Sequence, residues 1–440
     1  MDLKKSAKEV MKKGILLLTG ICLLAGCGRT GGESKTPEPV YSLDKAEEVF
    51  QMSSEKDGKG IDEEQLAAGV NSFAFSLYGQ IRGEENIFFS PYSLCSALSM
   101  LDLSAGGETK TELEALLGIR DLDSWSVEMR AYLEKEWTDD TFLITANSIW
   151  MEPSKEWSSR IEEDFLQPAG YYYQSELYET DFRNKGDEAA NQVNEWVKEK
   201  TRGMIPRLAD SFPPETVMVL INAVYFEGKW NTPFEAFYTH KANFYGVAGT
   251  VKADMMNQYD SWFAYTEAYG IKGVTLRYQD SDVVMKIFLP MDPETENISD
   301  LFLALSDEEK LALISSLDTA EGEWLERLAL PKFTVEQEIE GLNEILRNMG
   351  LQNAFLEEQA DFDILAEDVF LSEVRHRAKI IVDEEGSRAA AATEIDMTDG
   401  AAPIAEEPPK VFIADHPFLY VIQDEQTGMI LFFGQVNSLE

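Results

Sequence analysis

The sequence predicts one large α+β domain, and three observations support this. Segments whose apolar residues recur at helical spacing come first, whereas strand-like segments dominate later. Hydrophobic residues make up 44% of the 440 residues and aromatic residues 11%, which is enough for a sizeable core. After about residue 60 the chain has no internal repeat and no Gly/Ser-rich break that would separate domains.

Helical patterns open the predicted domain. Apolar residues recur at helical spacing from Leu66 to Ile81, which predicts an amphipathic helix. A second apolar stretch runs from Ser93 to Leu103 and is closed by Gly106-Gly107. The segment from Ala190 to Lys200 also places its apolar residues on one helical face.

Strand-like runs come next along the chain. Apolar runs bounded by turn residues cover 217–226, 283–289, 369–371 and 378–382. The chain then ends in an apparent hairpin, because 418–423 and 429–433 flank a polar turn that ends in Gly428.

The first 27 residues predict an export signal rather than part of the fold. Basic residues precede an apolar run from Ile15 to Leu24, which is too short to span a bilayer comfortably. The run ends in Leu24-Ala25-Gly26-Cys27, which resembles a bacterial lipobox. This resemblance implies cleavage before Cys27 and lipidation of its thiol; an ordinary signal peptide or a short anchor helix are the alternatives. Residues 28–60 contain Gly31-Gly32 and are predicted to be a flexible tether.

Charge and cysteine usage exclude several kinds of partner. The chain has 38 basic and 80 acidic residues and a formal net charge of −42. A surface this acidic repels phosphate and sulfate, so neither nucleic acid nor heparin is an expected partner. Once Cys22 leaves with the signal and Cys27 is lipidated, only Cys95 remains, so no intramolecular disulfide is expected. The three histidines lack metal-ligand spacing, and we expect neither a metal nor another cofactor.

Six short motifs occur along the predicted domain. They are Asn86-Ile-Phe-Phe-Ser-Pro-Tyr-Ser93, Leu103-Ser-Ala-Gly-Gly-Glu-Thr109, Asn194-Glu-Trp-Val197, Asn222-Ala-Val-Tyr-Phe-Glu-Gly-Lys-Trp230, Pro331-Lys-Phe333 with His376, and His416-Pro-Phe418 with Gly434. In this order they resemble the serpin family of serine protease inhibitors over essentially residues 61–440. The resemblance implies a monomer with helices packed on a large mixed β-sheet A, further sheets B and C, and an exposed reactive-centre loop at about 384–410.

In inhibitory serpins this loop is a bait that a protease attacks to form an acyl-enzyme, after which the loop inserts into sheet A as an extra strand. The hinge that the resemblance implies here consists of Glu384, Gly386, Ser387, Ala389, Ala390, Ala391, Ala392 and Thr393. Strand side chains alternate between faces, so every second hinge residue from Ser387 onward would face the interior, and all of these are small. Taken alone, the alanine run would also suit a short helix or a linker.

The position of the scissile bond is implied by the family spacing. Counting Glu384 as the first residue, the seventeenth is Gly400, which implies cleavage between Gly400 and Ala401. A longer loop leaves Ala401-Ala402 and Ala402-Pro403 as alternatives. Small neutral residues disfavour a trypsin-like partner and favour an elastase-like or subtilisin-like serine protease.

Two further structural sites are implied by the resemblance. Ser90, Ser93, Asn222 and His376 match the shutter, where polar groups bridge the strands that must part. Lys332, Glu384 and Trp230 match the breach, where insertion starts. A charge left unpaired at the breach would be costly, so loss of Lys332 or Glu384 is expected to promote premature insertion or polymerisation.

Two other functions compete for the same residues. The first alternative is a surface binding protein that has the serpin fold but does not trap proteases. A loop that is cleaved without formation of a covalent complex would indicate this alternative. An enzyme is disfavoured, because the chain has no Gly-x-Ser-x-Gly elbow and no His and Asp arrangement that suggests a triad. The sequence therefore predicts a lipid-anchored inhibitor of a serine protease on the outer face of a bacterial membrane, and not an enzyme.

Overall fold

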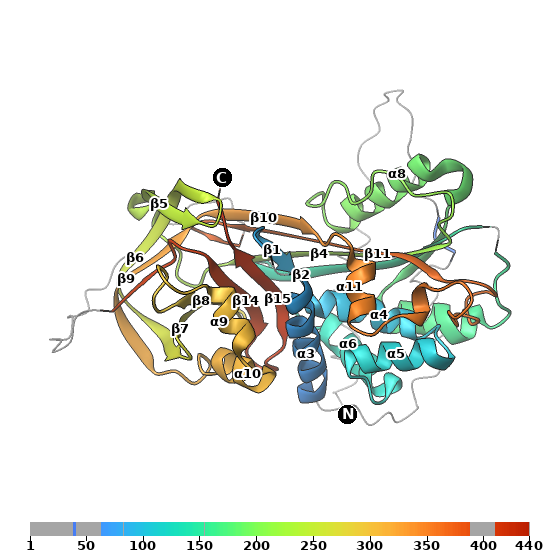
Figure 1. Ribbon diagram of the computed structural model, residues 1–440, viewed down its shortest axis with the longest axis horizontal. Coiled ribbons are helices and arrows are strands. Elements are labelled where there is room, and N and C mark those ends of the chain that lie inside the picture. The colour runs from blue at the N-terminus through green and yellow to red at the C-terminus, as the bar shows by residue number, and fades with distance from the viewer. Residues whose placement is uncertain (1–37, 41–62, 82, 154, 388–409, 440) are drawn as a thin grey trace, which may run out of the picture. The chain divides into compact units, whose positions relative to one another are not determined.

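The computed structural model describes residues 38–40, 63–81, 83–153, 155–387 and 410–439. The chain divides into residues 1–35, which lie outside the described ranges, and a compact unit from Thr36 to Glu440. All of the described residues belong to this second unit (Figure 1). Among them no helix is long and apolar enough to cross a bilayer.

One sheet of this unit contains Gly386 and Ser387 of the predicted hinge. Over the described residues it has six strands, in the order β10 (Phe333–Glu338), β11 (Leu371–Val382), β12 (Gly386–Ser387), β4 (Met218–Lys229), β2 (Thr141–Met151) and β3 (Glu176–Glu179). Strands β4 and β11 are parallel and pair directly from Leu371 opposite Met218 to Lys379 opposite Tyr225. Beyond that point β12 lies between them and is antiparallel to both.

Helices cover both faces of the six-stranded sheet because its central strands are apolar on both sides. Leu220 and Val224 of β4 belong to the main core, together with α4 (Pro91–Asp102). Val219 and Ile221 of the same strand face a second core that includes side chains of α8 (Phe182–Lys200). Figure 1 shows α8 on one face of the sheet and α4 on the other.

The remaining strands form one continuous sheet. Over the described ranges its order is β1 (Ile87–Phe89), β15 (Ile430–Val436), β14 (Phe418–Asp424), β8 (Val283–Pro290), β7 (Ile271–Arg277), β6 (Gly249–Ala268), β9 (Gly322–Pro331) and β13 (Lys410–Ile413), with β5 (His240–Gly246) also paired to β6. The expected sheets B and C correspond to its two parts, which share β6. Strand β6 spans 20 residues, pairs with β9 from Met255 to Ala264 and with β7 from Tyr265 to Ala268, and so joins the two.

The other helical segments surround these sheets. They are α3 (Glu63–Ile81), α5 (Gly107–Leu117), α6 (Leu122–Leu133), η1 (Glu162–Leu166), α7 (Gln167–Tyr173), η2 (Ala236–Tyr238), α9 (Ile298–Ala304), α10 (Asp307–Ser315), α11 (Leu342–Asn348) and η3 (Asn353–Phe355). The start of α4 is set by its sequence: Ser90 is the N-cap, its side chain accepts a hydrogen bond from the Ser93 backbone, and Pro91 occupies the first helical turn.

Most expected elements coincide with observed ones. The helix at 66–81 is α3, the stretch at 93–103 is most of α4, and the C-terminal hairpin is β14 and β15. The runs at 369–371 and 378–382, expected as separate strands, belong to one region in which β11 extends from Leu371 to Val382. Cys95 is a free, fully buried cysteine within α4.

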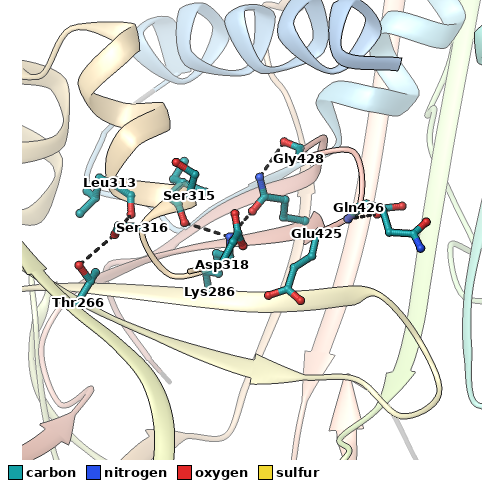
Figure 2. Close-up of polar contacts among 12 residues, drawn as sticks. Thr266, Lys286, Leu313, Ser315, Ser316, Asp318, Glu425, Gln426 and Gly428 are labelled. Atoms are coloured by element: carbon teal, nitrogen blue, oxygen red, sulfur yellow. Dashed lines mark hydrogen bonds and ion pairs between the residues drawn. The ribbon is translucent and has the colours of Figure 1, made fainter. Parts of the chain in front are cut away.

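A buried polar cluster below α10 was not anticipated from the sequence (Figure 2). Lys286 of β8 is fully buried, and its Nζ donates hydrogen bonds to the Ile314 carbonyl at 3.0 Å and to the side chains of Asp318 and Gln423. Burial lowers the pKa of Lys286, while the contact with Asp318 opposes the lowering. The cluster fastens the end of α10 to the nine-stranded sheet.

Candidate functional site

The point where β12 separates β4 from β11 is the first part of the site. Ser387 pairs with Gly228 of β4 and Val382 of β11, and its side chain is fully buried. Its Oγ lies 2.7 Å from the Tyr278 hydroxyl. A Cβ on Gly386 would lie 2.1 Å from the Gly228 carbonyl oxygen, so only glycine fits where β12 meets β4.

The position of these two residues differs from the expected exposed loop at 384–410. Gly386 and Ser387 already form part of the six-stranded sheet, and Lys410 is the first residue of β13. The reason is local: two small residues fit between β4 and β11 without displacing a side chain. The other expected hinge residues (Ala389, Ala390, Ala391, Ala392 and Thr393), the expected scissile residues Gly400 and Ala401, and the expected lipidation site Cys27 lie outside the described residues.

Trp230 covers the buried end of β12. Its ring stacks on that of Tyr278, with centroids 4.8 Å apart and planes 13° from parallel. Its Nε1 donates to the Asp383 carbonyl at 3.0 Å, and its backbone N–H donates to the Glu385 carbonyl at 2.8 Å. Burial raises the pKa of Tyr278, which therefore stays a neutral hydroxyl beside Ser387. Trp230 thus holds the turn between β11 and β12 in place.

Lys332 and Glu384 form an ion pair at the same end of the sheet. The Lys332 Nζ lies 2.6 Å from one carboxylate oxygen of Glu384, and the Thr239 hydroxyl donates to the other at 2.9 Å. Burial by itself would raise the pKa of Glu384, but the hydrogen bonds from Lys332 and Thr239 outweigh it and lower the pKa. The hydrogen bond to Glu384 in turn raises the pKa of Lys332. Thr239 was not identified from the sequence.

The second part of the site lies midway along β4 and β11. His376 and Asn222 are directly opposite each other across the parallel ladder, and both are fully buried. The Asn222 amide donates to the Ser93 hydroxyl at 2.7 Å and to the Asn147 Oδ1 at 2.6 Å. Ser90 closes the cluster, because its backbone N–H donates to the His376 Nε2 at 3.2 Å. Asn147, on the neighbouring strand β2, was not identified from the sequence.

The hydrogen bonds of His376 define its protonation state. Its Nε2 accepts from Ser90, so the proton is on Nδ1, which bonds to the Asn222 Oδ1. Burial lowers the pKa of His376 to about 3. A neutral imidazole therefore links β11 to β4 and to the start of α4.

These two clusters mark the two ends of one path. The part of the parallel ladder from His376 to Lys379 lies between the two clusters, and each cluster contacts both β4 and β11. At one end, the short strand β12 already lies between β4 and β11. Along the rest, the direct hydrogen bonds between β4 and β11 could be replaced by hydrogen bonds to a longer β12. Such a site can accept a further strand, which is a mechanical rather than a catalytic property.

Comparison with known proteins identifies the architecture. The family model described as serpin (serine protease inhibitor) matches residues 68–439. An uncharacterised serpin-like protein of Thermococcus kodakarensis is 32% identical and covers 97% of this chain and 99% of its own length. The leukocyte elastase inhibitor of Xenopus tropicalis is also 32% identical, over 85% of this chain and 100% of its own.

Among solved structures, the thermophilic serpin tengpin in its native state superposes with a TM-score of 0.77. It shares 31% sequence identity and covers 87% of this chain and 96% of its own. The matched region includes both clusters described above, and the helices packed on a large mixed sheet are those expected of the fold. The chain therefore belongs to the serpin family.

Proposed function

We propose that this chain is a suicide-substrate inhibitor of serine proteases, cleaved at or near the bond between Gly400 and Ala401. The observation that carries the proposal is the placement of β12. Its two residues are antiparallel to β4 and to β11, whereas β4 and β11 are parallel to each other. Extending β12 would replace one parallel ladder by two antiparallel ladders, which have the more stable pairing and more hydrogen bonds. This difference supplies a driving force for insertion.

The register of β12 predicts where each inserted residue would lie. Ser387 is opposite Gly228, and each step toward Gly400 moves one step back along β4, so Met397 would lie opposite Met218, the first residue of that strand. Gly400, with an attached protease, would thus be carried just beyond the far end of the sheet.

Thr393 has a special place in this register. Counted from the Ser387 pairing with Gly228, Thr393 would lie opposite Asn222; counted from the pairing with Val382, it would lie opposite His376. Both counts lead to the same place, because Asn222 and His376 are paired with each other in the present parallel ladder. A small hydroxyl side chain at this point offers a hydrogen-bond partner to both residues that insertion would part.

The chemistry begins as ordinary proteolysis. The serine hydroxyl of the protease attacks the Gly400 carbonyl carbon, and an ester forms as the bond to the Ala401 nitrogen breaks and that nitrogen gains a proton. Residues 401–440 stay bound through β13, β14 and β15. Insertion then displaces the protease before water hydrolyses the ester.

The small neutral residues around Gly400 support an elastase-like or subtilisin-like target. We also propose that the chain acts as a monomer and is attached to the outer face of a bacterial membrane through a lipid on Cys27, with residues 28–60 as a tether. This part of the proposal rests on the lipobox-like sequence alone.

A gel experiment tests the proposed function. The chain is incubated with elastase, subtilisin, chymotrypsin and trypsin, and each mixture is denatured in SDS. We expect a covalent complex with elastase or subtilisin and a released C-terminal peptide whose sequence begins at Ala401. Complete cleavage without complex in every mixture would contradict inhibition and favour a binding protein of the same fold.

A further inference from the structure

A cavity of about 200 Å³ lies where α3, α6 and the turn between β14 and β15 meet. Figure 1 shows α3 between β15 and α6, and it packs against both. The lining of this cavity contains no residue of the insertion point of β12 and none of the His376 cluster. The proposed inhibition leaves the cavity unexplained, so it is a separate candidate site.

The carboxylate of Asp424 lies on the buried side of this cavity. Asp424 is the last residue of β14 and is fully buried. Its Oδ2 accepts hydrogen bonds from the Tyr132 hydroxyl at 3.0 Å and from the Lys135 Nζ. Its Oδ1 accepts one from the Gln426 backbone N–H at 2.9 Å. An ionised carboxylate has about four acceptor positions, so beside these three donors the Asp424 carboxylate can accept one more, from a ligand in the cavity.

The charges of the lining favour a cation. Besides Asp424, the cavity is lined by Glu63, which is exposed, and by Glu128, which is half-buried, so both lie at its rim. Against these three carboxylates the lining has one ammonium group, that of Lys135. A partly enclosed space with an excess of negative charge attracts cations and repels anions. A ligand with a carboxylate or phosphate group is therefore disfavoured.

The size of the cavity and its apolar side chains define the rest of the ligand. Leu66 and Met429 are buried in its wall, and the side chain of Ala131 and the ring of Tyr132 add further apolar surface. A water molecule takes up about 30 Å³ in the liquid, so the cavity has room for about seven non-hydrogen atoms. A short alkyl chain with an ammonium group at each end fits this size and this distribution of charge.

The walls of the cavity are fastened to one another in the unliganded chain. Asn71 of α3 holds the turn: its amide donates to the Gly428 carbonyl at 2.9 Å, and its Oδ1 accepts from the Ile430 backbone N–H at 2.8 Å. The contacts of Asp424 join α6 to the same turn. A pocket that is formed before binding loses less conformational entropy when a ligand enters it.

We propose that this cavity is a binding site for a short alkyl diamine. One ammonium group donates to Asp424, and the methylene chain packs on Leu66 and Met429. The other ammonium group lies against Glu63 and Glu128 at the rim. A lysine side chain of a partner protein has the same alkyl-ammonium chemistry but only one ammonium group, so the rim carboxylates favour the free diamine. The inference does not rest on protease inhibition.

Isothermal titration calorimetry of the full chain with cadaverine tests the site. The titrations are done in about 150 mM NaCl, which screens attraction to the general acidic surface. Glutarate, of similar length and opposite charge, is the ligand control. Lysine blocked at both its α-amino and its carboxyl group represents the side chain of a partner protein.

Two variants remove features of the cavity. Ala131→Trp blocks the cavity from an exposed position of α6, and its matched control is Ala115→Trp at an exposed position of α5. Glu63→Gln combined with Glu128→Gln removes the rim charges.

The charge control removes the same charge elsewhere. It is Glu294→Gln combined with Glu296→Gln, at two exposed positions between β8 and α9. Circular dichroism checks that every variant is folded.

We expect one saturable site for cadaverine in the unmodified chain. Binding should be at least about tenfold weaker in Ala131→Trp and about fivefold weaker in the rim variant, with both control variants within about twofold. Unaltered binding in Ala131→Trp, or an equal loss in the charge control, would overturn the proposal. Glutarate binding as tightly as cadaverine would also overturn it. Tighter binding of the blocked lysine than of cadaverine would overturn it by assigning the cavity to a lysine of a partner protein.

Discussion

At Ser387 the predicted hinge meets the interior of the protein. The side chain is fully buried beside Tyr278, and the neighbouring Gly386 lies against the Gly228 carbonyl. This position can accept a small side chain, whereas a charged side chain there would be buried without a counterion. The size of residue 387 should therefore separate cleavage of the loop from its insertion.

The first prediction concerns this position. Ser387→Arg should leave loop cleavage as fast as in the unmodified chain but reduce the trapped fraction severalfold, because a guanidinium cannot enter the space beside Tyr278. Ser387→Thr is the matched control and should trap normally. Densitometry of the covalent complex measures both. Normal trapping by Ser387→Arg would show that insertion does not require a small, uncharged side chain at residue 387.

The second prediction concerns His376. Its pKa is about 3 in the folded chain against an ordinary value of 6.5, so the unfolded chain binds the proton more readily. The stability that this neutral histidine contributes is complete above pH 6.5. It is lost as the pH falls from 6.5 toward 3, by about 1.4 kcal/mol per pH unit, which gives a loss of about 2 kcal/mol at pH 5.

Urea unfolding at pH 7.5 and pH 5.0 measures this effect. His376→Gln keeps a donor and an acceptor but has no proton to gain, so its stability should fall less between the two pH values. Equal losses in the variant and the unmodified chain would mean that His376 does not control this pH dependence.

On the scale of elements, α4 packs against the six-stranded sheet but carries an unfavourable buried carboxylate, that of Asp102, at its C-terminal end. Asp102, its last residue, is fully buried, and one of its carboxylate oxygens has no hydrogen-bond partner. Burial raises the pKa of Asp102 to about 6, although Lys110, 3.2 Å away, opposes the rise. A negative charge at a helix C-terminus is also unfavourable to the helix dipole. The ionised form is thus destabilising.

The third prediction concerns the buried charge of Asp102. Because the pKa of Asp102 is raised above its unfolded value near 3.8, the folded state loses stability as the pH rises from 3.8 through 6. Asp102→Asn should therefore stabilise the chain by up to about 3 kcal/mol at pH 7.5 and by almost nothing at pH 4. Thermal melts at the two pH values measure this. A destabilised variant at pH 7.5 would show that the pair with Lys110 outweighs the burial of the charge.

On the scale of the whole molecule, the charge of the chain affects how it meets a protease. The formal net charge is −42, and a field of one sign attracts partners of the opposite sign over distances longer than direct contact. Salt screens such fields, with a Debye length of about 10 Å at 0.1 M.

The fourth prediction is that the rate of complex formation with a basic protease falls severalfold between about 20 and about 300 mM NaCl, because added salt shortens the screening length. Stopped-flow inhibition kinetics measure this rate, and an acidic protease of the same specificity is the control. A rate that does not change with salt would contradict electrostatic steering.

The fold could be predicted from the sequence because the family motifs lie in closely packed, buried parts of the structure, where few residue types fit. The helix at 66–81 and the β14–β15 hairpin are present as predicted, and Ser90, Ser93, Asn222 and His376, which come from three separate motifs, form one buried cluster. The long strand β6 was missed, since its second half alternates weakly and is partly exposed on both faces.

Other residues of the site could not be found from the sequence. Asn147, Thr239 and Tyr278 are single residues outside any motif, and each joins the site through a partner 75 or more residues away in the chain. Local patterns contain no information about such pairs. Only the folded sheet, in which β2, β4 and β11 are neighbours, brings them together.

The central claim is that the six-stranded sheet accepts the cleaved loop as an additional strand. The most direct measurement is a thermal melt of the intact chain beside the same chain cleaved in the loop by a protease that does not remain bound. Insertion would add about ten net hydrogen bonds, so the cleaved chain should melt at least about 10 °C higher. A cleaved chain that melts at the same temperature as the intact chain, or lower, would contradict insertion.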